Sequence, residues 1–336
     1  VYPLYENALR AHLGQSFAEA QQESGEIWSR FSDVAAANDG AWIKKPTSAQ
    51  AVITPSDNNR PIAFPYNKLM VANSSVNQGA GFIVTSVGEA RARGIPEGKW
   101  IYVGNGAAAH EAGSPLKRDR YDRSVSMEIS ITKALALNAV QPEDLDLVEL
   151  YSCFPCIPKL ARRIIDWPVE RPASVFGGLT FGGGPIGNYM SHAVVSMVER
   201  LRAEHGTGLL FANGGYATHN HSIVVSSAPI PAASFPLSYD FQAEADAARA
   251  AIPDLDQEYA GPATVESYTV FYQRDGSVRA GVVVAKTPDG KRTLGHVPAA
   301  DVATITRLTA PDAEPVGSSG EIVGKAAAGL NHWRFA

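Results

Sequence analysis

Short apolar runs alternate with longer segments of helical periodicity over residues 97–235, and this alternation limits the possible folds more than any other feature. Four runs predict buried strands: "KWIYVGNGAAA", "LDLVELYS", "TGLLFANGG" and "NHSIVVSSAP". Apolar residues recur at helical spacing in the segments "RYDRSVSMEISITKALALNAV", "CFPCIPKLARRIIDW" and "HAVVSMVERLRAEHG". Strands that alternate with helices predict an α/β fold built in layers.

The region before these strands predicts helices, a long loop and one further strand. Apolar residues recur at roughly helical spacing over residues 2–30, which predicts a helix, and residues 38–65 are loop-rich with several prolines. The run "GAGFIVTS" (79–86) predicts a buried strand, and "VGEARARGIP" predicts a helix that ends at Gly94. The chain begins at Val1 and enters the first helical pattern directly, as we expect for a fragment or a processed chain.

The composition changes near residue 236. The charged, alanine-rich segment "YDFQAEADAARAAIPDL" predicts a helical linker over 236–261. From residue 263 the pattern is β throughout, and Arg274-Asp275-Gly276 and Asp289-Gly290 supply hairpin turns between β-branched runs. The sequence therefore predicts a small all-β domain over 262–330.

Length, charge and cysteine content limit the function classes. A chain of 336 residues predicts two domains, or one large domain with an appendage. A net charge of -5 argues against a nucleic-acid binder, and no apolar run reaches the length of a membrane helix. Cys153 and Cys156 are too few for a disulfide framework and favour a cytoplasmic location. Their C-x-x-C spacing permits a redox or metal pair, whereas flanking prolines favour two small buried side chains.

The stretch "GGLTFGGGPIGNYMSH", from Gly177 to His192, has six glycines in its first eleven residues. Glycine at this density indicates backbone that lies close to another group or turns where a side chain would clash. The stretch lacks the Lys and Ser/Thr of a P-loop and the spacing of a dinucleotide-binding motif. A tight structural crossover and a catalytic loop therefore remain the two interpretations of this stretch.

Several blocks, in this order and spacing, resemble the C-terminal half of thiolases: "VELYSCFP", "GGLTFGGGPIGNYMSHAVVSMVERLR" and "LLFANGGYATHNH". The likeness is greatest to the sterol-carrier-type branch and its acetyl-CoA acetyltransferase-like members. The β tail resembles the extra C-terminal domain of thiolase-like protein type 1.

This resemblance implies a layered αβα fold. Residues 1–75 would form the loop and helical region, 76–96 the end of the N-terminal half with its last strand, and 97–235 the C-terminal half. The nucleophilic cysteine of thiolases lies in the N-terminal half. We therefore expect that half as a separate chain or fragment that partners this one.

The resemblance also implies three site loops. Tyr151 stands where the family's first loop carries Asn or His, and a tyrosine hydroxyl can donate a hydrogen bond there. Gly184 stands where the second loop carries the histidine that activates the nucleophile. The third loop, which carries an acid/base cysteine in thiolases, falls at Ala212-Asn213-Gly214 or one residue later, so Asn213 is a candidate hydrogen-bonding residue without a thiol beside it.

Three histidines remain as candidate acids or bases, because histidine titrates near neutral pH. His219 and His221 follow the third loop at a spacing that places them on one side of an extended segment. His192 lies eight residues after Gly184, at the start of a predicted helix. Solvated loop residues and a structural helix residue are the alternatives. No third ligand accompanies the His-x-His pair, so no metal site is predicted.

For the acyl carrier, the resemblance implies coenzyme A or acyl-CoA as a substrate, with no tightly bound cofactor. Arg60, Tyr66, Lys68 and Met70 lie in the matching loop block and are candidate contacts for it. Three functions are open: an acyl-CoA acyltransferase of the acetyl-CoA acetyltransferase type, an atypical protein that binds CoA or lipid, and a scaffold subunit of a hetero-oligomer.

Overall fold

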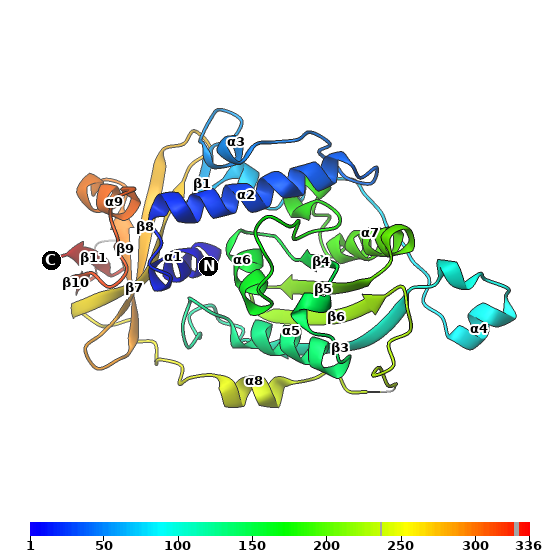
Figure 1. The fold of residues 1–336 in the computed structure, drawn as a ribbon. Helices are drawn as coiled ribbons and strands as arrows, with labels where there is room; N and C mark the ends of the chain where they lie inside the picture. Colours follow the sequence, from blue (N-terminus) through cyan, green and yellow to red (C-terminus); the bar gives the residue numbers. More distant parts are fainter. Residues whose placement is uncertain (236, 326–328) are drawn as a thin grey trace.

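The computed structural model describes residues 1–235, 237–325 and 329–336 (Figure 1). A four-stranded sheet forms its centre, in the order β3 (Tyr102–His110), β6 (His219–Ser226), β5 (Thr207–Gly214) and β4 (Leu147–Leu150). Strands β4 and β5 are parallel, and the other neighbours are antiparallel. All four predicted strands of this region are present.

Helices lie on both faces of the sheet (Figure 1). Helix α5 (Val125–Leu137) covers one face, where Ser130 shares a 2.8 Å hydrogen bond with Ser222 of β6. Helix α7 (Tyr189–Glu204) packs on β5 and β4 at the other face, and α6 (Cys156–Ile164) follows β4. The buried apolar side chains of these layers form the main core. The predicted layered α/β arrangement is therefore present.

The first predicted helix is instead two helices, α1 (Tyr2–His12) and α2 (Phe17–Ala36), so the prediction of one helix over 2–30 is wrong. Gly14 adopts a left-handed conformation with φ 65°, which ends the first helix. Ser16 then begins the second with a capping box, because its hydroxyl accepts from the Glu19 amide and the Glu19 carboxylate accepts from the Ser16 amide.

Residues 79–86 form no strand, so that prediction is also wrong. Phe82, Ile83 and Val84 are 50%, 93% and 71% exposed, and no strand among the described residues pairs with them. An apolar run is typical of a strand buried on both faces, but a strand needs neighbours to accept its backbone hydrogen bonds. The segment leads into α4 (Val87–Ala92), which projects from the body of the protein (Figure 1).

The C-terminal region is a closed barrel. Strands β7 (Gly261–Tyr272), β8 (Val278–Lys286), β9 (Arg292–Pro298), β11 (His332–Phe335) and β10 (Ser319–Val323) are neighbours in this order, and β10 pairs back onto β7. Only β9 and β11 are parallel. This is the strand order of five-stranded Greek-key barrels of the OB type. The region is not purely β, because α9 (Val302–Thr309) lies between β9 and β10.

Segments near the N-terminus pack against the C-terminal barrel. Strands β1 (Pro61–Ala63) and β2 (Tyr66–Asn67) extend the barrel sheet beyond β7, and α1 packs against β7. Helices α3 (Ala49–Ile53) and α8 (Gln242–Ala248) lie in the loop region and in the linker. The barrel and the layered sheet are thus joined through segments that are distant in sequence.

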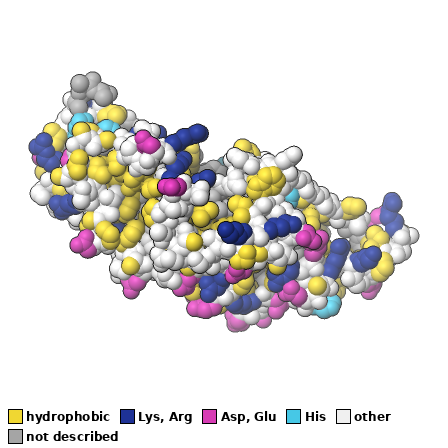
Figure 2. Space-filling model, turned by 90° about the horizontal axis from the view of Figure 1, so that it is seen from above, with side chains coloured by type: hydrophobic (Ala, Val, Ile, Leu, Met, Phe, Trp, Pro, Cys, Tyr) yellow, Lys and Arg dark blue, Asp and Glu magenta, His cyan; other side chains and the backbone are white. Residues whose placement is uncertain are grey.

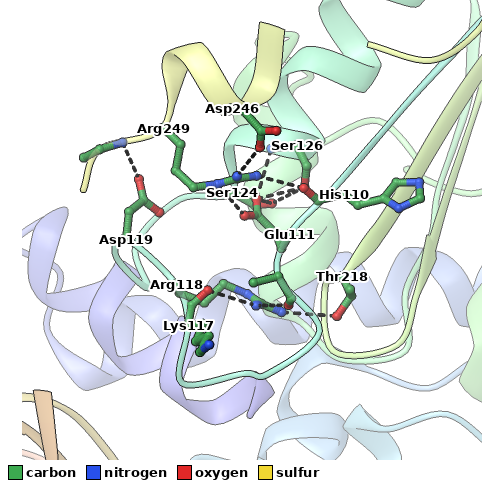
Figure 3. Close-up of polar contacts among 12 residues, drawn as sticks. His110, Glu111, Lys117, Arg118, Asp119, Ser124, Ser126, Thr218, Asp246 and Arg249 are labelled. Carbon is green, nitrogen blue, oxygen red and sulfur yellow. Dashed lines mark hydrogen bonds and ion pairs between the residues drawn. The ribbon is translucent and has the colours of Figure 1, made fainter. Parts of the chain in front are cut away.

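Two buried arginines connect the barrel to the sheet. Arg292 of β9 is fully buried, is held by both carboxylate oxygens of Glu266, and donates to the carbonyls of Leu116 and Arg118. Arg118 in turn donates to Tyr216 O at 3.0 Å and to Thr218 Oγ1 at 3.2 Å (Figure 3). The barrel therefore holds the turn between β5 and β6 through one loop.

Figure 2 shows one face of the elongated molecule, on which Lys and Arg side chains are interspersed with Asp and Glu. Within the described residues, no helix combines the length and apolar character required to cross a bilayer.

Candidate functional site

The glycine-rich stretch is tightly enclosed along most of its length. Gly177 has φ 107°, and a Cβ there would lie 2.9 Å from backbone atoms of Ala35. The loop is fixed to a neighbouring segment because the amides of Trp42 and Ile43 donate to Gly182 O and Phe181 O at 3.0 and 2.8 Å. These contacts explain why glycine is required at the sharp turns.

Gly184 differs from its neighbours. The nearest atoms to a Cβ built at Gly184 are 3.4 Å away, which is ordinary contact, and its φ is not in the left-handed region. Its amide donates to Asn73 O at 2.8 Å. A side chain could therefore start at this position, so steric demand does not account for the glycine.

Behind this loop lies a buried carboxylate that sequence reasoning did not single out. Glu149 of β4 is fully buried and accepts hydrogen bonds from Tyr189 Oη at 2.6 Å, Ser174 Oγ at 2.8 Å and the Val175 amide at 3.0 Å. Burial raises the pKa of Glu149 to about 7, although the hydrogen bonds from Tyr189 and Ser174 act to lower it. A carboxyl that ionises near neutral pH is typical of functional sites, and also of buried structural networks.

Tyr151 and His192 belong to the same neighbourhood. The Tyr151 ring lies 5.5 Å from that of Tyr189, edge to face, and burial raises the pKa of Tyr151 to about 12. His192 of α7 is 6% exposed and stacks on Phe176 at 5.1 Å, and Phe176 in turn contacts Tyr189. Burial lowers the pKa of His192, so its imidazole is neutral near pH 7.

Asn213 points to the opposite face of the sheet. Its Nδ2 donates to Asn220 Oδ1 at 2.9 Å, Asn220 donates to Ser126 Oγ at 2.7 Å, and Ser126 donates to Glu111 Oε1 at 2.8 Å. Burial acts to raise the pKa of Glu111, but hydrogen bonds from Ser126 and the charge of Arg249 hold it below its usual range. Asn213 therefore belongs to a structural polar network that joins α5, β6 and α8, and Figure 3 shows the contacts of Glu111 with Ser126 and Arg249 in it.

His219 and His221 are brought together with a third histidine that the sequence analysis missed. In the antiparallel register of β3 and β6, His110 lies opposite His219. The His110 ring centre is 4.8 Å from that of His219 and 6.0 Å from that of His221. Burial and the neighbouring histidines lower the pKa of His221. The sheet register, which cannot be read from the sequence, supplies this cluster.

His221 also lines a groove of about 430 Å³. Its walls are mainly apolar and come from α7, the sheet and the segment before α8, with residues Met190, Val194, Leu210, Ala212, Ile223, Phe235, Leu237 and Tyr239. Pockets of this size hold drug-sized ligands. Within the described residues, no group of His, Cys, Asp and Glu side chains has the arrangement needed to hold a metal ion.

This fold can be compared with those of known proteins. A structure described as a monomeric SCP2-thiolase like protein type 1 from Mycobacterium smegmatis aligns with 100% of this chain and 72% of its own length, at 30% identity and a TM-score of 0.88. This chain belongs to the SCP2-thiolase-like protein type 1 family. The model of the thiolase-like protein type 1 additional C-terminal domain matches residues 240–325. The predicted family and thiolase-like fold are confirmed.

Two structures of human mitochondrial 3-ketoacyl-CoA thiolase, one in complex with CoA, each align with 67% of this chain, at 16% and 17% identity and TM-scores of 0.47. A search of curated protein sequences finds no significant match.

The two thiols of this SCP2-thiolase-like chain are free and buried. Burial raises the pKa of Cys153 to about 12, and it raises the pKa of Cys156 well above its ordinary value. Neither thiol is therefore ionised near neutral pH, and a thiol reacts as a nucleophile only when ionised.

The candidate CoA contacts of this SCP2-thiolase-like chain separate into two groups. Tyr66 is buried with its hydroxyl donating to Glu6 Oε2 at 2.8 Å, and Met70 is fully buried, so both are packing residues. Lys68 is exposed, and Arg60 is half-buried and donates to Pro61 O at 3.1 Å. Only Arg60 and Lys68 retain atoms that a ligand can reach.

Proposed function

We propose that this thiolase-superfamily protein binds acyl-CoA or a related acyl lipid, and that residues of this chain alone do not carry out thiolysis. Thiolysis needs a thiolate, a base that activates it, oxyanion donors and an acid that gives a proton to the α-carbon of the leaving group. The observation that carries the proposal is the content of the three site loops. Gly184 has no side chain, Ala212-Asn213 has no thiol, and Cys153 beside Tyr151 is buried and neutral.

The groove supports the binding part of the proposal. Its apolar walls fit an acyl chain, and most small-molecule sites combine apolar walls with a few polar groups. Arg60 and Lys68 remain candidate contacts for the phosphates of CoA. His192, Tyr151 and Glu149 are candidate binding or proton-holding groups behind the glycine-rich loop, without a nucleophile beside them.

Two measurements test this proposal. We expect no CoA-dependent cleavage of acetoacetyl-CoA to two molecules of acetyl-CoA by the purified chain, because it presents no ionised thiol. We also expect dodecanoyl-CoA to raise the melting temperature, since a ligand at 100 times its Kd stabilises the folded state by about 2.7 kcal/mol. Catalytic cleavage of acetoacetyl-CoA, or an unchanged melting temperature at saturating ligand, contradicts the proposal.

A second candidate function is acyl transfer with a nucleophile from another polypeptide, as an acetyl-CoA acetyltransferase-type enzyme or a subunit of a larger complex. The exposed apolar segment 79–86 favours it, because its backbone amides make no hydrogen bond to another described residue. Such a segment can be added to the sheet of a partner. Ile83→Asp then abolishes thiolysis by a copurified complex while the melting temperature of the isolated chain stays unchanged.

A further inference from the structure

One buried carboxylate contacts both ends of the glycine-rich stretch. Glu149 of β4 accepts a hydrogen bond from Ser174 Oγ at 2.8 Å, three residues before the stretch begins at Gly177. Its other carboxylate oxygen accepts from the hydroxyl of Tyr189, the first residue of α7, at 2.6 Å. Glu149, Ser174 and Tyr189 are 0%, 1% and 3% exposed. These contacts therefore lie inside the layered unit and do not depend on what covers its surface.

Ser174 connects the carboxylate of Glu149 to the backbone of the stretch. Its hydroxyl donates to Glu149 and accepts from the amides of Phe176, Gly177 and Gly178 at 3.1, 2.8 and 2.9 Å. Gly177 and Gly178 both have positive φ, 107° and 67°, which glycine adopts without a steric cost. A hydroxyl that donates to a carboxylate becomes a stronger acceptor, because hydrogen bonds in a chain polarise one another. The turn that begins the loop therefore depends on Glu149.

No opposite charge close to Glu149 offsets its ionisation. Strand β5 and residues 173–182 contain no ionisable side chain, and Glu149 is the only one in β4. Burial and hydrogen bonds are the main influences on the pKa of Glu149, and no cation of the described residues is among them. The titratable neighbours are Tyr189, Tyr151 and His192. All three are neutral near pH 7, because burial raises the pKa of both tyrosines and lowers that of the histidine.

The charged side chains of the surrounding helices have other partners or are exposed. Helix α2 contacts the loop through the apolar residues Phe31 and Ala35. On α6, Lys159 pairs with Glu6, and both arginines pair with Glu23 of α2. The remaining charged residues of α2 and α7 are Glu19, Glu26, Arg30, Asp33, Glu199, Arg200, Arg202 and Glu204. Those of α7 follow Tyr189 by ten or more positions, so they lie towards the far end of the helix.

The two protonation states of Glu149 therefore place different demands on its surroundings. A protonated carboxyl is uncharged and can donate its proton to Tyr189 Oη, while its other oxygen still accepts from Ser174 and the Val175 amide. An ionised carboxylate at the same position is a buried charge without a counter-ion, and contact with water removes much of that cost. Strands β4 and β5 are fixed by their ladder of hydrogen bonds, whereas the glycine-rich stretch belongs to no sheet. The stretch is the cover that can move.

We propose that Glu149 is the latch of the glycine-rich loop, defined as residues 174–184: its protonated carboxyl holds the loop closed, and its ionisation lets the loop open to water. The loop carries Gly184, and Tyr151 and His192 belong to the same neighbourhood, so the latch sets the conformation of the candidate site. Glu149 is thus a positioning residue. This inference goes beyond the proposed function and does not rest on it, since no ligand takes part.

Amide hydrogen exchange of the chain, followed by mass spectrometry at pH 6 and pH 8, measures the opening of the loop. Rates are corrected for the intrinsic pH dependence of exchange and expressed as protection factors. A carboxyl that ionises near pH 7 in the closed loop and near pH 4.5 in water makes opening about 10-fold more favourable at pH 8 than at pH 6. We expect the protection of residues 174–184 to fall by about this factor and to stay below that of α5, because a local opening precedes global unfolding.

Variants assign the opening to the carboxyl. Glu149→Gln cannot ionise, so the protection of its loop stays constant from pH 6 to pH 8. Tyr189→Phe removes a donor that lowers the pKa of Glu149, so the fall in protection moves to higher pH. Glu199→Gln, an exposed position on α7, is the matched control and keeps the fall of the wild type.

Three results overturn the inference. The first is equal protection of the wild-type loop at pH 6 and pH 8, and the second is a fall in protection that persists in Glu149→Gln. The third is protection of the loop equal to that of α5 at both pH values, because the loop then opens only when the whole protein unfolds. If Glu149→Gln does not fold, a fall in Tyr189→Phe at the same pH as in the wild type overturns the inference in its place.

Discussion

Glu149 makes the stability of the protein depend on pH in a direction opposite to that of most carboxylates. Its folded pKa is raised from 4.5 to about 7 because it is buried between β4 and the glycine-rich loop. A rise of this size corresponds to about 3 kcal/mol at 1.36 kcal/mol per pH unit. The stabilising contribution is fully present below the unfolded pKa and is lost as pH rises through about 7.

Glu149→Gln removes the ionisable proton and leaves an amide of the same shape. Its amide nitrogen can donate to Tyr189 Oη while its oxygen accepts from Ser174 Oγ and the Val175 amide, so the exchange adds a pH-independent cost of about 1 kcal/mol. Urea unfolding at pH 5 and pH 8 separates the two effects. We expect the wild type to exceed the variant in free energy of unfolding by about 2–3 kcal/mol more at pH 5 than at pH 8.

Other titrating groups cancel in this comparison, because they are the same in both proteins. Glu199→Gln, on the exposed side of α7, is the matched control. A wild-type advantage that is equal at both pH values means that Glu149 is ionised in the folded protein at pH 5, and it refutes the reasoning.

Three further predictions follow from single contacts. Cys153 and Cys156 do not react with iodoacetamide at pH 7.5 in the folded protein and react fully in urea; rapid alkylation of the native chain, seen by mass spectrometry, contradicts their burial. Arg292→Met lowers the free energy of unfolding by about 3–5 kcal/mol, since it leaves a carboxylate and two carbonyls without their donor; a loss below about 1 kcal/mol in urea unfolding would count against it. Gly177→Ala destabilises the fold by more than about 2 kcal/mol, whereas Gly184→Ala changes it by less than about 1 kcal/mol, as thermal melts of the pair can check.

The positions of most helices, strands and turns could be predicted from the local sequence. The exceptions are segments whose structure depends on pairing with a distant segment. The strands of the layered sheet, the helix that follows the glycine-rich stretch, and the hairpin turns at Gly276 and Gly290 all have short-range signals. The break at Gly14 was also visible in the sequence, because a glycine followed by a serine cap interrupts the helical period. The apolar run at 82–84 led to a wrong strand prediction. Its local pattern is that of a strand, but a strand also needs a second strand to pair with, and these residues are exposed.

In the candidate site, too, the sequence shows which residue types are present, and the fold decides which of them meet. Side-chain chemistry selected His219, His221 and His192 as titratable residues, and the resemblance to thiolases selected Gly184 as the position without a basic side chain. Sequence could not pair His110 with His219, because the register of β3 and β6 joins residues more than a hundred positions apart. It could not single out Glu149 either, since a glutamate in an apolar strand gains a raised pKa only when other elements bury it.

The sequence by itself determined the layered α/β core and the family likeness, because these depend on residue types and their spacing. Tertiary structure decided which side chains meet. It closed the barrel by pairing β10 with β7, placed Asn213 and His221 on opposite faces of the sheet, and left residues 82–84 exposed. Each of these outcomes depends on contacts between distant segments, whose energies no local pattern contains.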